Sequence, residues 1–216
     1  MFRAAIFDFD GTLIELTLDF SDLRRHVERL ALTYVPRAFI RGLDSLYMLE
    51  MIDEVEKKLG TPGAAFRQEA YTILRDLEVK AAQGTAVYPY TRDVLTVLRG
   101  RGVKIGVMTR NCAQAVRTVF PDMDAYVDAM VTREDVRPVK PHPAHVGAVL
   151  ELLGRVDPVE AILVGDHPTD IFAGIAAGTT TVGVLTGRTE RADFEKAGAA
   201  FVVRDIRDVP ALIGRV

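Results

Sequence analysis

The 216-residue sequence has only one cysteine and no long apolar segment. A lone cysteine, Cys112, excludes an intrachain disulfide and is typical of a reducing compartment. No segment approaches the roughly 20 apolar residues that span a bilayer, and the apolar stretch before Asp8 is too short for a signal peptide. We therefore expect a cytoplasmic protein that does not enter a membrane.

A strong excess of charge is also missing, since the formal net charge is only −3. This balance gives no general attraction to nucleic acid or to anionic lipid, so neither is an expected partner. A phosphorylated ligand would have to be held by a few local cations and a metal. The apolar fraction of 49% is sufficient for a buried core, and the length fits one domain with a small insertion.

Short apolar runs recur along the chain and alternate with amphipathic helical stretches. The runs cover residues 4–7, 103–108, 161–164, 180–185 and 200–203. The helical stretches cover residues 90–101, 113–120, 144–153, 169–177 and 189–197. Continuous apolar runs are typical of strands buried on both faces of a parallel sheet. The alternation predicts an α/β fold with a doubly wound parallel sheet, in which ligands bind beyond the carboxyl ends of the strands.

One region interrupts this alternation, because residues 19–83 show helical periodicity and no strand signal. Pro36 separates a first helix from a second one over residues 37–59, and Gly60 and Gly63 separate that helix from a third over residues 64–82. We interpret residues 17–83 as a small helical domain inserted after the first strand. Residues 1–16 and 84–216 then form the α/β core.

The first predicted strand ends in two carboxylates, Asp8 and Asp10, followed by Gly11. Side chains alternate along a strand, so both carboxylates project to the same side. They repel each other at a buried strand end unless a cation compensates, and hard oxygen ligands favour magnesium. Gly11 permits the backbone to turn close to a ligand. Taken alone, the pair could equally cap the following turn.

Polar residues also follow other predicted strands. Thr109 precedes a helix whose N-terminus could bind phosphate, and Lys140 lies in a loop stiffened by prolines. Asp166 follows another strand, with Asp170 one helical turn later. Each has an ordinary alternative: a helix cap for Thr109 and Asp166, and a solvated surface position for Lys140. All would nevertheless converge on one edge of the sheet.

The order of these signals closely resembles that of the haloacid dehalogenase-like superfamily. The sequence has Asp-x-Asp-Gly-Thr, then Thr, then Lys-Pro, then Gly-Asp-x-x-x-Asp between residues 7 and 170. The resemblance implies a Rossmann-like core, and it implies that the helical insertion is a mobile cap over the site.

The resemblance also implies a role for each motif residue. Asp8 would be the nucleophile that forms an aspartyl-phosphate, and Asp10 would act as general acid and base. Thr109 would hydrogen-bond the phosphoryl group, and Lys140 would neutralise charge on it and on Asp8. Magnesium is the implied cofactor, and its expected ligands are Asp8, the backbone carbonyl of Asp10, Asp166 and Asp170.

Residues beside these motifs are predicted to contact the substrate, namely Gly11, Thr12, Arg110 and Asn111. Many relatives have asparagine directly after the hydroxyl residue, whereas here Arg110 precedes Asn111. Arg110 could bind a second anionic group of the substrate, or it could point into solvent.

These motifs predict a magnesium-dependent phosphatase that hydrolyses a small phosphorylated metabolite, similar to phosphoglycolate phosphatases. An aspartate at position 10 favours phosphatase and phosphomutase over the dehalogenases of the superfamily, so a phosphomutase acting on a sugar phosphate is the main alternative. A phospho-accepting receiver domain and a catalytically silent binding protein are less consistent with the first-strand nucleophile and the intact motifs. The protein is expected to be a monomer or a homodimer.

Overall fold

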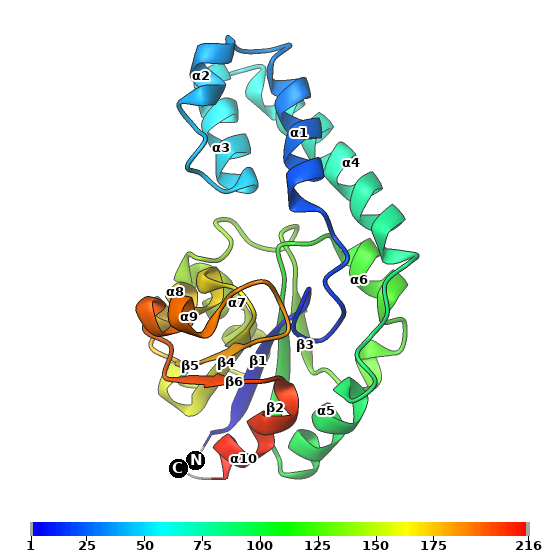
Figure 1. The fold of residues 1–216 in the computed structure, drawn as a ribbon, viewed down its shortest axis with the longest axis vertical. Coiled ribbons are helices and arrows are strands. Elements are labelled where there is room, and N and C mark those ends of the chain that lie inside the picture. The colour runs from blue at the N-terminus through cyan, green and yellow to red at the C-terminus, as the bar shows by residue number, and fades with distance from the viewer. Residues whose placement is uncertain (1, 215–216) are drawn as a thin grey trace. The chain divides into compact units, whose positions relative to one another are not determined.

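The computed structural model describes residues 2–214 (Figure 1). The chain divides into two compact units, one formed by Met1–Leu16 with Ala82–Val216 and the other by Thr17–Ala81. The first unit is the α/β core, and the second contains helices without strands among its described residues.

The α/β core contains one parallel sheet of six strands within the described residues, in the order β3-β2-β1-β4-β5-β6. The strands are β1 (Ala4–Asp8), β2 (Lys104–Met108), β3 (Ala129–Val131), β4 (Ala161–Gly165), β5 (Thr180–Val184) and β6 (Phe201–Val203). Five of them lie at the apolar runs seen in the sequence. The short strand β3 was not predicted, because three residues give no periodicity. The α/β fold with a doubly wound parallel sheet is confirmed.

Helices follow the strands and cover both faces of the sheet (Figure 1). The α-helices of the core are α5 (Thr91–Gly100), α6 (Ala113–Val119), α7 (Pro143–Leu152), α8 (Pro168–Ala177), α9 (Arg191–Ala197) and α10 (Val209–Ile213). Three short 3₁₀ segments are η1 (Met123–Ala125), η2 (Pro158–Glu160) and η3 (Ile206–Asp208). No helix within residues 2–214 combines the length and the apolar character that crossing a membrane requires.

The alternation of side chains along β1 divides the core into two layers. Phe7 belongs to an apolar cluster with side chains of α5, α6 and α10, whereas Ile6 belongs to a cluster with side chains of α7 and α8. Every residue of β1 is buried. Burial on both faces explains why the strand sequence is continuously apolar until it reaches Asp8.

The register of the central strands brings their carboxyl ends to one edge of the sheet. Asp8 pairs with Met108, the last residue of β2. Phe7 pairs with Val164 in β4, so Asp8 lies level with the end of β4. The residues that directly follow β2 and β4 therefore lie beside Asp8.

The inserted unit contains the helices α1 (Phe20–Ala31), α2 (Arg37–Arg41), α3 (Met48–Leu59) and α4 (Gly63–Ala82). The single helix expected over residues 37–59 is wrong, since the chain leaves the helix at Gly42 and resumes it at Met48. The Arg24 guanidinium donates hydrogen bonds to the carbonyls of Leu43 and Leu46, at 3.2 and 2.6 Å. The Leu43 carbonyl also accepts a 3.0 Å hydrogen bond from the Leu46 N–H, so backbone and side-chain donors together hold this turn.

The chain leaves the α/β core and re-enters it at adjacent points. Ile14 and Val87 form an antiparallel bridge, and the Glu15 N–H donates a 3.0 Å hydrogen bond to the Ala86 carbonyl. Both segments belong to the core, so the ends of the insertion are fixed by backbone pairing on the core side.

The packing of β1 predicts a large cost for truncating Phe7. The side chain is fully buried between the sheet and its helices, so we expect Phe7→Ala to lower the free energy of unfolding by about 3–5 kcal/mol. Phe201→Ala is a matched control, because Phe201 on β6 is 39% exposed, and its expected cost is below about 1 kcal/mol. Chemical denaturation of both variants measures the difference, and equal costs would contradict this view of the core.

Candidate active site

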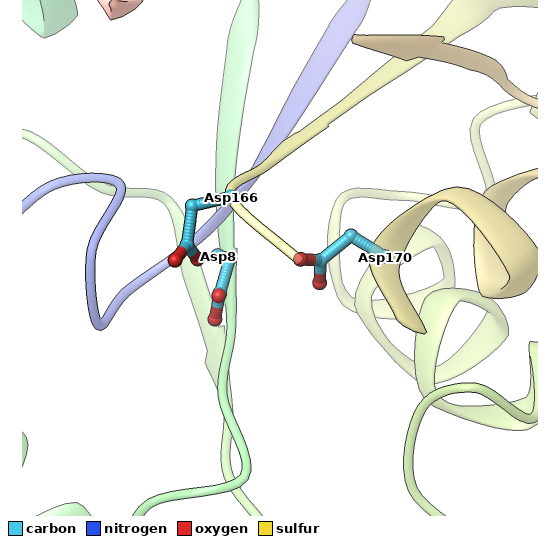
Figure 2. Close-up of side chains that lie close together, drawn as sticks. All are labelled: Asp8, Asp166 and Asp170. Carbon is cyan, nitrogen blue, oxygen red and sulfur yellow. The ribbon is translucent and has the colours of Figure 1, made fainter. Parts of the chain in front are cut away.

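Three buried carboxylates meet at the carboxyl ends of the central strands. Asp8 ends β1, Asp166 follows β4, and Asp170 lies in the first turn of α8. Figure 2 shows the three side chains converging, and each offers an oxygen within 4.8 Å of the other two. Asp8 is 6% exposed, Asp166 5% and Asp170 0%. The first motif, at Asp8, and the last motif, at Asp166 and Asp170, therefore form one acidic cluster.

The ammonium group of Lys140 lies between two of these carboxylates. Its Nζ is 2.5 Å from Asp8 Oδ1 and 2.7 Å from Asp170 Oδ1. Lys140 is only 3% exposed, so the surface position considered from the sequence is wrong. Burial alone would lower the pKa of Lys140, but the carboxylates of Asp170 and Asp8 outweigh burial and raise it. The lysine is therefore a fixed positive charge.

One ammonium does not balance three carboxylates. Burial, followed by the charges of Asp8 and Asp170, raises the pKa of Asp166 far above its usual range. Burial also raises the pKa of Asp170, against the opposing charge of Lys140. Further positive charge beside Asp166 and Asp170 would favour their ionised forms. Oxygen donors from three aspartates match the ligand preference of a hard divalent cation, so the cluster fits a metal site.

Asp166 is enclosed by two backbone segments that have no side chain. A Cβ on Gly11, whose φ is +80°, would lie 2.4 Å from Asp166 Oδ2. A Cβ on Gly187 would lie 1.9 Å from the same oxygen. The Thr186 hydroxyl donates a hydrogen bond to the Gly11 carbonyl, which ties the loop after β5 to the loop after β1. Sequence reasoning missed Thr186 and Gly187, because a glycine in a loop has many ordinary explanations.

Asp10 lies apart from the three clustered carboxylates and has hydrogen-bond donors of its own. The Thr109 hydroxyl is 3.2 Å from Asp10 Oδ2, and the Asn111 side-chain amide is 3.1 Å from Asp10 Oδ1. Thr109 Oγ1 also accepts a 3.0 Å hydrogen bond from the Asn111 N–H. The segment after β2 therefore orients Asp10, and it leaves the aspartate partly exposed.

Helix capping does not explain the other motif residues. The N-cap of α6 is Cys112 rather than Thr109, and the N-cap of α8 is His167 rather than Asp166. Asp170 does complete a capping box, because its Oδ2 accepts the His167 N–H at 3.1 Å. Its other oxygen accepts from Lys140. Thr109 and Asp166 thus carry polar groups that the helices do not require.

Two further residues predicted to contact substrate lie against the charged cluster. Thr12 is fully buried, and its hydroxyl lies 3.5 Å from Asp166 Oδ1. Arg110 is half-buried, and its Nη1 donates a 2.9 Å hydrogen bond to the Lys140 carbonyl. Arg110 therefore does not simply point into solvent. Contact of Gly11, Thr12, Arg110 and Asn111 with substrate stays a prediction.

The enclosure of Asp166 predicts that Gly187→Ala weakens cation binding. The added methyl group must displace the Asp166 carboxylate, and we expect roughly a 10–100-fold loss of Mg²⁺ affinity by calorimetry. Gly147→Ala is the control, since a Cβ at Gly147 in α7 would meet nothing within 4 Å. Wild-type affinity in the Gly187 variant would refute the packing of this loop against the cluster.

The chain is similar to known proteins in sequence and in fold. The family model described as haloacid dehalogenase-like hydrolase matches residues 5–184. A pyrophosphatase PpaX from Bacillus pumilus (strain SAFR-032) is 35% identical over 129 residues, which cover 59% of this chain and 59% of that protein. That match thus spans less than two thirds of the relative's length. A PpaX from Bacillus cereus (strain G9842) is 32% identical over 221 residues, covering 99% of this chain and 97% of the relative.

Two further similarities extend over nearly the whole chain. A phosphoglycolate phosphatase from Shigella dysenteriae serotype 1 (strain Sd197) is 27% identical, covering 97% of this chain and 92% of that protein. A crystal structure of CbbY from Rhodobacter sphaeroides in complex with phosphate has a TM-score of 0.66 at 20% identity, covering 97% of this chain and 96% of that chain. The structural likeness shows a shared fold. By the family match and by its fold, the chain belongs to the haloacid dehalogenase-like hydrolases.

Proposed function

We propose that this protein is a magnesium-dependent phosphatase that hydrolyses small phosphate monoesters through an aspartyl-phosphate on Asp8. The observation that carries the proposal is the buried ammonium of Lys140 between Asp8 and Asp170, inside a cluster of three carboxylates. The similarity to a phosphoglycolate phosphatase and to PpaX pyrophosphatases supports phosphoryl transfer as the reaction class.

Asp8 is the proposed nucleophile. A carboxylate that attacks an anionic phosphoryl group meets electrostatic repulsion, which fixed positive charge must reduce along the reaction path. Lys140 Nζ already contacts Asp8 Oδ1, so it neutralises the nucleophile and stands beside the phosphoryl oxygens as they approach. Thr109 provides a buried hydroxyl at the adjacent strand end for the same group.

Asp10 is the proposed general acid and base. It is partly exposed, and the Thr109 hydroxyl and the Asn111 amide hold its carboxyl group. In the first step, Asp10 donates a proton to the leaving alcohol oxygen as Asp8 forms the acyl-phosphate. In the second step, Asp10 takes a proton from the water that hydrolyses this intermediate.

Magnesium is the proposed cofactor, held by Asp8, Asp166, Asp170 and the backbone carbonyl of Asp10. The three side chains supply hard oxygen donors in a buried cluster, which is the donor type that Mg²⁺ prefers. When bound, the cation would neutralise charge on the phosphoryl oxygens and on the carboxylates. Lys140 keeps its ammonium in place independently of the cation, through Asp8 and Asp170.

Residues 17–83 are the proposed cap, and residues 1–16 and 84–216 the catalytic core. The compact helical unit Thr17–Ala81 supports this division, as does the pairing of Glu15 with Ala86 where the insertion begins and ends. A cap of this kind excludes water and supplies contacts to a small phosphorylated metabolite. The single cysteine supports placing the enzyme in the reducing cytoplasm.

A panel of phosphate esters with Mg²⁺ tests the proposed activity. The panel contains 2-phosphoglycolate, sugar phosphates and pyrophosphate, and both free phosphate and isomerised substrate are measured. Release of phosphate from a monoester, abolished by chelation, is the expected result. Isomerisation of a sugar phosphate without net release of phosphate would establish a phosphomutase. Turnover of pyrophosphate alone would show that the substrate is a phosphoanhydride and not a monoester.

Substitution of the nucleophile gives a sharper prediction. Asp8→Asn removes the attacking oxygen, so we expect kcat to fall by roughly 10³-fold or more and the phosphorylated protein to disappear from mass spectra of the quenched reaction. Asp124→Asn is the control, because the Asp124 side chain is 74% exposed and forms a surface salt bridge with Arg117. Retained turnover or retained phosphoprotein in the Asp8 variant would exclude Asp8 as the nucleophile.

A further inference from the structure

A buried histidine, His145, holds the backbone of the active-site lysine. His145 lies in α7, five residues after Lys140, and is fully buried. The Lys140 N–H donates a 3.1 Å hydrogen bond to His145 Nδ1. On the other side of the ring, Nε2 lies 3.2 Å from the carbonyl oxygen of Val131, the last residue of β3.

These two partners fix the protonation of the imidazole. The Lys140 N–H is a donor, so Nδ1 must be the unprotonated acceptor. The Val131 carbonyl only accepts, so Nε2 must carry the proton. Only the neutral Nε2–H form satisfies both bonds. Burial, and then the nearby charge of Lys140, lower the pKa of His145 to about 3, so the neutral form is retained at physiological pH.

The histidine connects Lys140 to a second active-site segment. The Val131 carbonyl also accepts a 3.0 Å hydrogen bond from the Thr109 N–H. A continuous path thus runs from the Lys140 N–H through the imidazole of His145 to the Val131 carbonyl, and on to the Thr109 N–H. The Lys140 carbonyl is held separately by Arg110 Nη1 at 2.9 Å. Both peptide groups that flank the Lys140 Cα therefore have a fixed partner.

We propose that His145 is a positioning residue that sets the location of the Lys140 ammonium relative to Asp8 and to Thr109. The proposal rests on the proposed function, since it concerns a reaction that uses these groups. His145 does not act on the substrate itself, because its ring is fully buried and both nitrogens are engaged. A displacement of about 1 Å at a reacting centre is enough to reduce a rate about 10²-fold.

Three substitutions of His145 separate positioning from packing. Asn places its side-chain oxygen near the position of Nδ1 and can accept the Lys140 N–H. Gln can place its amide near Nε2 and bond to Val131, but it does not reproduce the acceptor at Nδ1. Leu fills much of the space and bonds to neither. Val146→Ala is the control, since Val146 is the next residue of α7 and its buried side chain belongs to the apolar cluster around Ile6.

Kinetics of these full-length variants with Mg²⁺ and a hydrolysed ester test the proposal. We expect His145→Leu to lower kcat about 10–100-fold with KM changed less than threefold, His145→Asn to restore most of kcat, and His145→Gln to stay low. Val146→Ala should lose stability and keep its kcat. Wild-type kcat in the Leu variant, equal kcat in the Asn and Gln variants, or a matching loss of kcat in Val146→Ala would overturn the proposal.

A readout that needs no turnover separates this inference from the proposed function. In the wild type, nitrogen NMR of the His145 ring should show protonated Nε2 and unprotonated Nδ1. The Lys140 N–H should be protected from hydrogen exchange in the wild type and in His145→Asn, and should exchange faster in His145→Leu. An inactive wild type with these signals would refute the proposed phosphatase activity and leave the positioning role of His145 intact. A protonated Nδ1 in the wild type, or unchanged exchange of the Lys140 N–H in the Leu variant, would refute the positioning role.

Discussion

Three carboxylates and one ammonium group share a buried volume at the carboxyl ends of β1 and β4, and this crowding of charge governs the site around them. Burial makes each isolated charge costly, so the group must be balanced locally. Lys140 provides one positive charge. The carboxylate oxygens suit a divalent cation, which would balance the remaining negative charge. The same balance is what a carboxylate nucleophile needs when it approaches a phosphoryl group.

The register of the sheet brings motifs that are distant in the sequence to one site. The sequence was sufficient to predict that the strand ends share one edge of the sheet. The runs before Asp8 and Asp166 are continuously apolar, and the run before Thr109 is interrupted only by Lys104, so each motif was expected to follow a buried strand. Parallel strands place such ends on a common edge, and the structure confirms this for Asp8, Thr109 and Asp166. Lys140 reaches the same edge from the loop between β3 and α7. The family match confirms the recognition made from the order of these motifs.

The contacts that hold the site could not be read in the same way. His145 bonds to Lys140 and Val131 through the way α7 packs beside β3, and a three-residue strand left no signal of where β3 lies. Gly187 reaches Asp166 from a loop after β5, and a glycine in a loop has many ordinary explanations. The segment between α2 and α3 accepts hydrogen bonds from Arg24, a residue on another helix. Each of these depends on tertiary contacts between segments separated in the sequence.

We propose that one cation binds between these carboxylates. Crystals grown with Mn²⁺, used as a heavier substitute for Mg²⁺, allow the cation to be located directly by anomalous diffraction. We expect one strong peak per chain in the acidic cluster, about 2.0–2.3 Å from oxygens of Asp8 and Asp166, with Asp170 bound directly or through water. A cluster without a peak at saturating Mn²⁺, or a peak held by other residues, would contradict it.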